Sequence, residues 1–87
     1  MRFLHNDLGH LDGNEVVEVT LSNAANVRLM DGSNFSAYRR GGRHDYYGGY
    51  VTRSPFTVRV PRGGHWHVAI DNGGHTGSVR VAVRVLG

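Results

Sequence analysis

The sequence contains no cysteine, no lysine and only two prolines, and it lacks any long hydrophobic run. Without cysteine, neither a disulfide framework nor thiolate chemistry is available, which is typical of a protein in a reducing compartment. No segment approaches the roughly 20 apolar residues that span a bilayer, and the early acidic residue Asp7 argues against a signal peptide. We therefore expect a soluble cytoplasmic protein without a membrane partner.

All ten basic residues are arginine, and the formal net charge is +3. Guanidinium groups suit phosphate or carboxylate recognition, whereas codon bias in a GC-rich bacterial genome would also favour arginine over lysine. The arginines are dispersed along the chain, which favours the codon explanation. A chain of 87 residues is short for two domains, so residues 1–87 are expected to form one domain. A homodimer would be one way to cover an edge strand in so small a domain.

Hydrophobic and polar residues alternate through most of the chain, which is the period of a β-strand with one buried face. Residues 33–40 instead predict one or two helical turns, with Ser33 or Asn34 as the N-cap and glycine at the end. The pair Gly48-Gly49 predicts a hairpin turn. The expected strands cover residues 15–22, 27–30, 43–47, 50–53, 56–60, 65–71 and 79–85.

Six to seven short strands separated by turn signals indicate an all-β protein. The expected architecture is a small antiparallel β-sandwich or jelly-roll-like barrel, with no more than two helical turns near residues 33–40.

Four segments carry a resemblance to a known family: MRFLHNDLGHL at residues 1–11, AANVRLMD at 24–31, SNF at 33–35 and GHWHV at 64–68. In these segments the chain resembles a bacterial family of uncharacterised proteins, domain of unknown function 1883. The resemblance covers essentially the whole chain. It implies a small β-rich protein, and some similar proteins are joined to a Toll/interleukin-receptor-type signalling domain. Residues 29–72 also look, more loosely, like β-sandwich modules appended to other bacterial proteins. Both resemblances imply a recognition module.

Two histidines separated by one residue, His65 and His67, are the most suggestive metal-ligating pattern. On a strand they share a face, so two imidazoles can reach one ion, and Asp71 or His75 would complete the site. His5 or His10 would be another source of a third ligand. The alternating Trp66 is expected to occupy the core, so both histidines are expected to face water. The plain alternative is therefore a pair of exposed histidines beside a turn.

His5, Asp7 and His10 form a second group within a short segment that contains glycine. On a strand His5 and Asp7 would share a face. Aspartate is common in turns, where it accepts hydrogen bonds from backbone amides, and we favour that structural interpretation of this group.

Arginines and aromatic residues are interleaved between positions 39 and 50, a composition typical of surfaces that stack bases and bind phosphates. The same composition is enriched in protein–protein hot spots, and tyrosine is also a common strand residue. The residues concerned are Arg39, Arg40, Arg43, His44, Tyr46, Tyr47 and Tyr50.

No catalytic set is recognisable, so the leading hypothesis is a non-catalytic recognition or interaction module with a link to bacterial signalling. It would bind an unknown protein partner and need no cofactor. One alternative is nucleic-acid or polyanion binding through residues 39–50, which salt would weaken. The other is a protein or enzyme that binds a divalent metal through His65 and His67.

Overall fold

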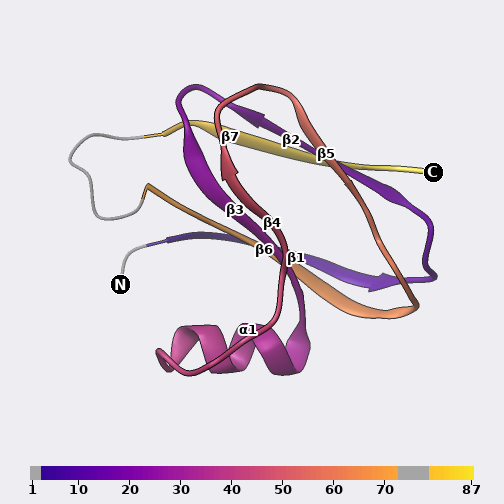
Figure 1. The fold of residues 1–87 in the computed structure, drawn as a ribbon. Helices are drawn as coiled ribbons and strands as arrows, with labels where there is room; N and C mark the ends of the chain where they lie inside the picture. The colour runs from indigo at the N-terminus through magenta and orange to yellow at the C-terminus, as the bar shows by residue number, and fades with distance from the viewer. Residues whose placement is uncertain (1–2, 73–78) are drawn as a thin grey trace.

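The computed structural model describes residues 3–72 and 79–87, and within them seven strands form two antiparallel sheets (Figure 1). One sheet has the strand order β1-β6-β3-β4 and the other β5-β2-β7. The strands are β1 (Leu4–Leu11), β2 (Val16–Leu21), β3 (Ala25–Asp31), β4 (Tyr47–Val51), β5 (Phe56–Arg59), β6 (Gly64–Asp71) and β7 (Val81–Leu86). The expected small all-β sandwich is confirmed.

The main core lies between the two sheets. Alternate residues of β2, β3 and β6 point into it, as the hydrophobic pattern predicts, and they are almost completely buried. The largest of these side chains are Val17, Val19, Val27, Leu29, Trp66, Val68 and Ile70. On β7 the valines at 81 and 83 are only partly buried against this core.

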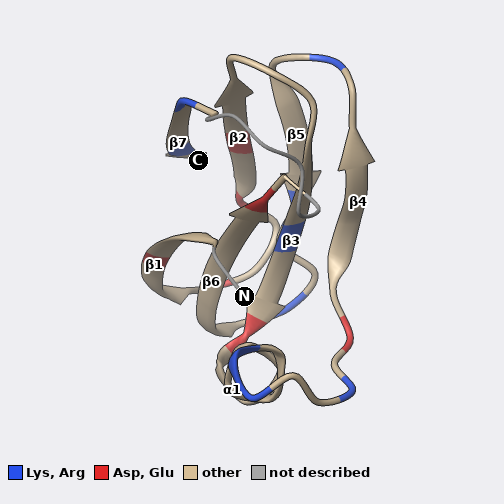
Figure 2. Ribbon diagram, turned by 90° about the vertical axis from the view of Figure 1, so that its left-hand side faces the viewer, with Lys and Arg blue, Asp and Glu red and all other residues tan. Residues whose placement is uncertain are grey.

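A single helix of the described residues, α1 (Gly32–Arg39), follows β3 and lies beside β6 and β3 at one end of the sandwich (Figure 2). Its N-cap is Asp31, not Ser33 or Asn34 as expected: the Asp31 carboxylate accepts a hydrogen bond from the backbone N–H of Asn34 at 3.0 Å. Gly41 follows the C-cap with φ 76°, a conformation that favours glycine. With eight residues, α1 is too short to cross a membrane, and no other helix is found in the described ranges.

The outer face of the β1-β6-β3-β4 sheet is the face turned away from the other sheet, and α1 packs on it. Phe35 and Tyr38 are buried there against Met30 and Ala69 in a second, smaller apolar cluster. The helix thereby covers the outward-facing side of β6, so that this strand is buried on both sides from Trp66 to Asp71.

The prediction of a hairpin turn at Gly48-Gly49 is wrong. The chain continues through both glycines as the single strand β4, which pairs with β3 from Tyr47↔Leu29 to Val51↔Ala25. Gly48 has φ 130°, and a Cβ at this position would overlap with the carbonyl oxygen of Val27. Glycine is required here because two backbones approach closely, not because the chain reverses.

Candidate functional site

Strand pairing brings three of the singled-out histidines and an aspartate together on the outer face. β1 and β6 pair antiparallel, with Asp7 opposite His67 and His5 opposite Ala69. We call His5, Asp7, His65 and His67 the histidine cluster. Its members come from two segments of the chain, and the hydrogen-bonded pairs among them are 58 and 62 residues apart in the sequence. The pairing of β1 with β6 brings the two segments together.

A β-bulge in β1 sets the direction of these side chains. The register shifts between Asp7 and Gly9, so Leu8 is the extra residue, and Gly9 has φ 71°. In a regular strand, residues three positions apart point to opposite faces. Because of the extra residue, Asp7 and His10 nevertheless lie opposite His67 and His65, which are two positions apart on β6. The bulge also turns the backbone N–H of Gly9 onto Oδ1 of Asp7 at 2.8 Å.

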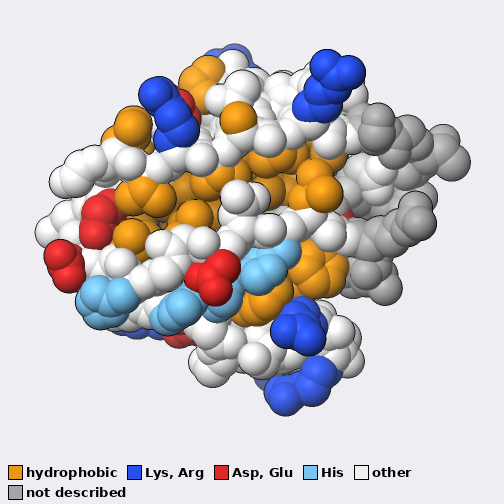
Figure 3. Space-filling view, turned by 180° about the vertical axis from the view of Figure 1, so that it is seen from behind, with side chains coloured by type: hydrophobic (Ala, Val, Ile, Leu, Met, Phe, Trp, Pro, Cys, Tyr) orange, Lys and Arg blue, Asp and Glu red, His pale blue; other side chains and the backbone are white. Residues whose placement is uncertain are grey.

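Short contacts connect the histidine cluster. Nε2 of His65 lies 2.5 Å from Oδ1 of Asp7, and Nε2 of His5 lies 2.9 Å from Nδ1 of His67. The rings of His65 and His67 stack with their centroids 4.8 Å apart. Figure 3 shows histidine side chains in a row along this side of the molecule, with an acidic side chain beside them.

The expectation that both histidines of β6 face water is wrong for His67, which is only 9% exposed. The Phe35 ring of α1 stacks on His67 at 4.5 Å and on His5 at 4.1 Å between centroids. The helix therefore covers His67 and leaves His65 at the exposed end of the strand.

The environment favours an ionised carboxylate and a neutral imidazole in the histidine cluster. The hydrogen bond from the Gly9 N–H, and then that from His65, hold the pKa of Asp7 below its usual value. Burial lowers the pKa of His67, and the neighbouring His5 and His65 add to this effect, while Asp7 and Asp31 oppose it. Both protonation states are those that a metal ligand requires.

The other residues expected as metal ligands lie elsewhere. Asp71 is at the opposite end of β6 from His65 and belongs to a separate polar network, described below. His75 lies outside the described residues. His10 neighbours His65 across the strands, but its Nε2 lies 3.4 Å from Oδ1 of Asp12. The described residues thus bring Asp7, and not Asp71, to His65 and His67.

The carboxylate of Asp71 is the centre of a second network on the outer face. It accepts hydrogen bonds from Arg28 Nη1 at 2.5 Å, from the Tyr38 hydroxyl at 2.9 Å and from Asn26 Nδ2 at 2.9 Å. Burial, followed by this bond to Asp71, raises the pKa of Tyr38 to about 12. The sequence pattern did not single out Arg28 or Asn26, whose roles depend on the pairing of β3 with β6.

The residues between 39 and 50 do not form one continuous surface. Arg39 and Arg40 are exposed at the end of α1, and Arg43 is exposed in the segment that follows. Tyr46 packs over the Arg28 guanidinium at 5.1 Å, and the ring of His44 lies 5.6 Å from that of Tyr46. Tyr47 instead faces Trp66, with centroids 6.2 Å apart. Tyr50 lies opposite Asn26 and is 64% exposed.

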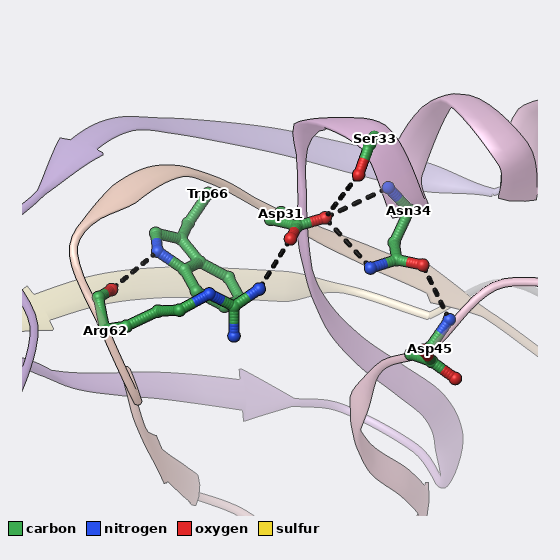
Figure 4. A network of polar contacts seen from close by, with 6 residues as sticks. All are labelled: Asp31, Ser33, Asn34, Asp45, Arg62 and Trp66. Atoms are coloured by element: carbon green, nitrogen blue, oxygen red, sulfur yellow. Dashed lines mark hydrogen bonds and ion pairs between the residues drawn. The ribbon is translucent and has the colours of Figure 1, made fainter.

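A pocket of about 130 Å³ lies where β3 meets α1. Figure 4 shows the polar contacts of its walls. Asp31 Oδ2 accepts a hydrogen bond from Arg62 Nη2 at 2.6 Å, and the Arg62 guanidinium lies over the Trp66 ring at 5.1 Å. On the other side, the Asn34 side chain accepts a hydrogen bond from the backbone N–H of Asp45. These contacts connect the walls of the pocket. The residues that line it are Met30, Asp31, Asn34, Asp45, Tyr47, Arg62 and Trp66.

Comparison with protein families gives one match. The family model described as "Domain of unknown function (DUF1883)" matches residues 1–87. No curated protein and no solved structure matches the chain. The family description assigns no activity.

Proposed function

We propose that this chain, which belongs to the DUF1883 family, is a non-catalytic recognition module that binds a protein partner through Tyr46, Tyr50 and Arg28. We call Arg28, His44, Tyr46 and Tyr50 the tyrosine–arginine surface. One observation carries the proposal: Tyr46, which is 42% exposed, packs over Arg28, an arginine whose position is already fixed by Asp71. Tyr50, which is 64% exposed, lies opposite Asn26 on the neighbouring strand β4. A cytoplasmic location in a bacterium, expected from composition and resemblance, is part of this proposal.

The chemistry of this surface suits a protein interface. Tyrosine and arginine carry a large share of the binding energy in protein interfaces, and tyrosine loses little conformational entropy when it is ordered. The Arg28 guanidinium is held by Asp71 and lies over the rings of Tyr38 and Tyr46 at 5.4 and 5.1 Å. A partner would therefore meet a preorganised surface, which lowers the entropic cost of binding.

The position of β4 supports the same proposal. β4 is the last strand in the order β1-β6-β3-β4, so it forms an edge of the sheet. An edge strand can accept an added strand from a partner through backbone hydrogen bonds, with side chains of the outer face providing specificity. Tyr50 projects from β4 itself. A signalling domain is the kind of partner that the family resemblance implies.

The pocket beside Asp31 is too small for a typical small-molecule substrate. Its volume of about 130 Å³ compares with roughly 300–1,000 Å³ for such sites. The ion pair between Asp31 and Arg62 lies in its wall.

The experiment uses the immobilised 87-residue chain to capture partners from an extract of the source cells. The proposal predicts a partner that binds the wild type and is lost with the double variant Tyr46→Ser/Tyr50→Ser. Leu86→Ser is the matched control, because Leu86 is a similarly exposed side chain on the other sheet. The purified partner should bind the double variant at least about 30-fold more weakly, the loss of one hot spot of about 2 kcal/mol. Equal loss in the control and the double variant would contradict the proposal.

Nucleic-acid or polyanion binding is the second candidate, favoured by the exposure of Arg39, Arg40 and Arg43 at and after the end of α1. It predicts that single-stranded oligonucleotides bind and that their affinity falls steeply with salt. The double variant Arg39→Ala/Arg43→Ala should lower this affinity for every sequence. If neither DNA nor RNA binds at low salt in a gel-shift assay, this candidate is excluded.

A further inference from the structure

Asp7, His65 and His67 each offer one potential ligand atom, and these three atoms all lie within 4.8 Å of one another. We propose that the three side chains bind a divalent transition-metal ion, with Zn²⁺ as the representative ion. The proposal depends on β1 and β6 and uses none of the residues of the tyrosine–arginine surface. The two proposals can therefore fail independently.

The ligand chemistry selects the class of ion. Two imidazoles and one carboxylate suit Zn²⁺ and neighbouring transition metals, whereas Mg²⁺ and Ca²⁺ prefer oxygen ligands. Three protein ligands would leave at least one coordination position for water or for a group from a partner. The histidine cluster therefore matches an open metal site, in which the ion remains accessible.

The adjustment needed to hold an ion is small and falls on exposed side chains. Ligand atoms about 2.0–2.2 Å from a tetrahedral ion lie roughly 3.3–3.5 Å from one another. The 2.5 Å contact between His65 Nε2 and Asp7 Oδ1 must therefore open slightly, and the longest separation, at most 4.8 Å, must shorten. Asp7 and His65 have side chains 53% and 54% exposed, so rotation about their side-chain bonds can make both changes.

The remaining ligand, His67, is held in place. The Phe35 ring stacks on it, and Nε2 of His5 forms a hydrogen bond with its Nδ1. Metal-binding histidines are commonly oriented by such a bond from their second ring nitrogen. In the proposed site Nε2 of His67 is therefore the ligand atom, and His5, which bonds Nδ1, acts as a positioning residue and not as one of the three ligands.

Ion binding requires a change of tautomer at His65. Nε2 of His65 lies 2.5 Å from the Asp7 carboxylate, which accepts hydrogen bonds, so Nε2 carries the ring hydrogen in this contact. An ion bound to Nε2 would need this hydrogen on Nδ1 instead, which is the arrangement found in metal-binding histidines.

The test measures the Zn²⁺ affinity of the full chain without a histidine tag, in competition with a chromophoric chelator. Wild type should bind one Zn²⁺, while His65→Ala and Asp7→Asn should each bind at least about tenfold more weakly, because loss of a ligand should cost no less than loss of a residue that only orients one. Both substitutions are at exposed positions, and circular dichroism checks that the fold is kept. His10→Ala is the matched control, because His10 is an exposed histidine beside His65 on the same face.

Two results would overturn the proposal. One is that wild type binds no Zn²⁺, Co²⁺ or Ni²⁺ at one equivalent. The other is that His10→Ala weakens binding as much as His65→Ala, which would indicate scattered surface binding. Co²⁺ absorption bands of tetrahedral type that disappear in Asp7→Asn would support it. For the positioning role, His5→Ala should weaken Zn²⁺ binding about 10–100-fold and His5→Gln should restore part of it.

Discussion

The guanidinium of Arg28 and the carboxylate of Asp71 form an ion pair at 2.5 Å on the outer face of the β1-β6-β3-β4 sheet. The two side chains are only 20% and 8% exposed. Neighbouring strands place them together, with Arg28 opposite Ala69 and Asn26 opposite Asp71. This pair fixes the arginine at the centre of the tyrosine–arginine surface, so the surface and the stability of the sheet depend on the same contact.

Asp71→Ala should lower the free energy of unfolding by about 3 kcal/mol, because it leaves the guanidinium of Arg28 buried without its counter-charge. The Tyr38 hydroxyl and the Asn26 amide lose their acceptor in the same variant. Urea denaturation measures the change. Arg84→Ala is the control: it removes Arg84, whose side chain is 67% exposed, from its ion pair with Glu18 and should cost less than about 1 kcal/mol. Equal losses in the two variants would contradict the central role of Asp71.

Tyr38 should make the protein less stable in strong alkali. Its pKa is raised from 10.0 to about 12 in the folded state, so unfolding favours loss of the phenolic proton. The resulting stability is complete below pH 10 and is lost as pH rises through about 12. Tyr38→Phe should remove this part of the pH dependence, measured by urea denaturation at a series of alkaline pH values. An unchanged slope in the variant would show that another group is responsible.

His67 should contribute to instability in acid. Burial lowers its pKa below the reference value of 6.5, so the unfolded chain binds a proton more readily than the folded chain. The stability that depends on the neutral ring is present above pH 6.5 and is lost as pH falls through the folded-state pKa. Asp7 and Asp31 oppose this shift, while His5 and His65 add to it. In an NMR titration, the His67 ring should become protonated below pH 6.5; protonation above that pH would contradict the prediction.

Gly48→Ala should destabilise the fold by about 1–3 kcal/mol, the cost of holding a non-glycine residue at an unfavourable positive φ. Overlap of the new Cβ with the carbonyl oxygen of Val27 should add to this cost. Gly41→Ala separates the two effects, since Gly41 also has a positive φ but nothing lies within 4 Å of the added Cβ. Thermal unfolding should therefore show a larger loss for Gly48→Ala than for Gly41→Ala.

Asp31→Ala should cost about 1 kcal/mol because α1 loses its N-cap. Asp31→Asn should keep most of the stability, since asparagine caps helices about as well as aspartate. It would lose only the charge that pairs with the half-exposed Arg62. Chemical denaturation of both variants measures the difference, and equal destabilisation would assign the effect to the ion pair instead of the cap.

The alternation of hydrophobic residues was sufficient to predict the sandwich, because inward-facing positions such as Val17, Val19 and Val68 repeat with period two. The sequence pattern gave a wrong prediction at Gly48-Gly49, because glycine occurs both in tight turns and at close approaches between strands. Gly48-Gly49 is as consistent with a tight turn as with a strand that approaches another backbone, and only the pairing of β4 with β3 distinguishes them.

The histidine cluster was predictable only in parts. The sequence places His65 and His67 on one strand face and groups His5 with Asp7, but no local signal shows that the two segments pair. The exposure of His67 was mispredicted because the covering residue, Phe35, comes from a helix elsewhere in the chain. A signal for the bulge was present in Asp7-Leu8-Gly9, since a glycine within a strand often marks such a site.

The pairing of the first strand with the sixth also constrains when this domain can fold during synthesis. β1 leaves the ribosome first, yet its partner β6 ends at Asp71, so most of the chain must be made before the two can pair. Until then the exposed strand depends on chaperones or on its own polar residues to avoid association with other chains. Native pairing of β1 should therefore wait until β6 has been synthesised, and a nascent chain that stops before β6 should lack both the β1-β6 and the β3-β6 pairings.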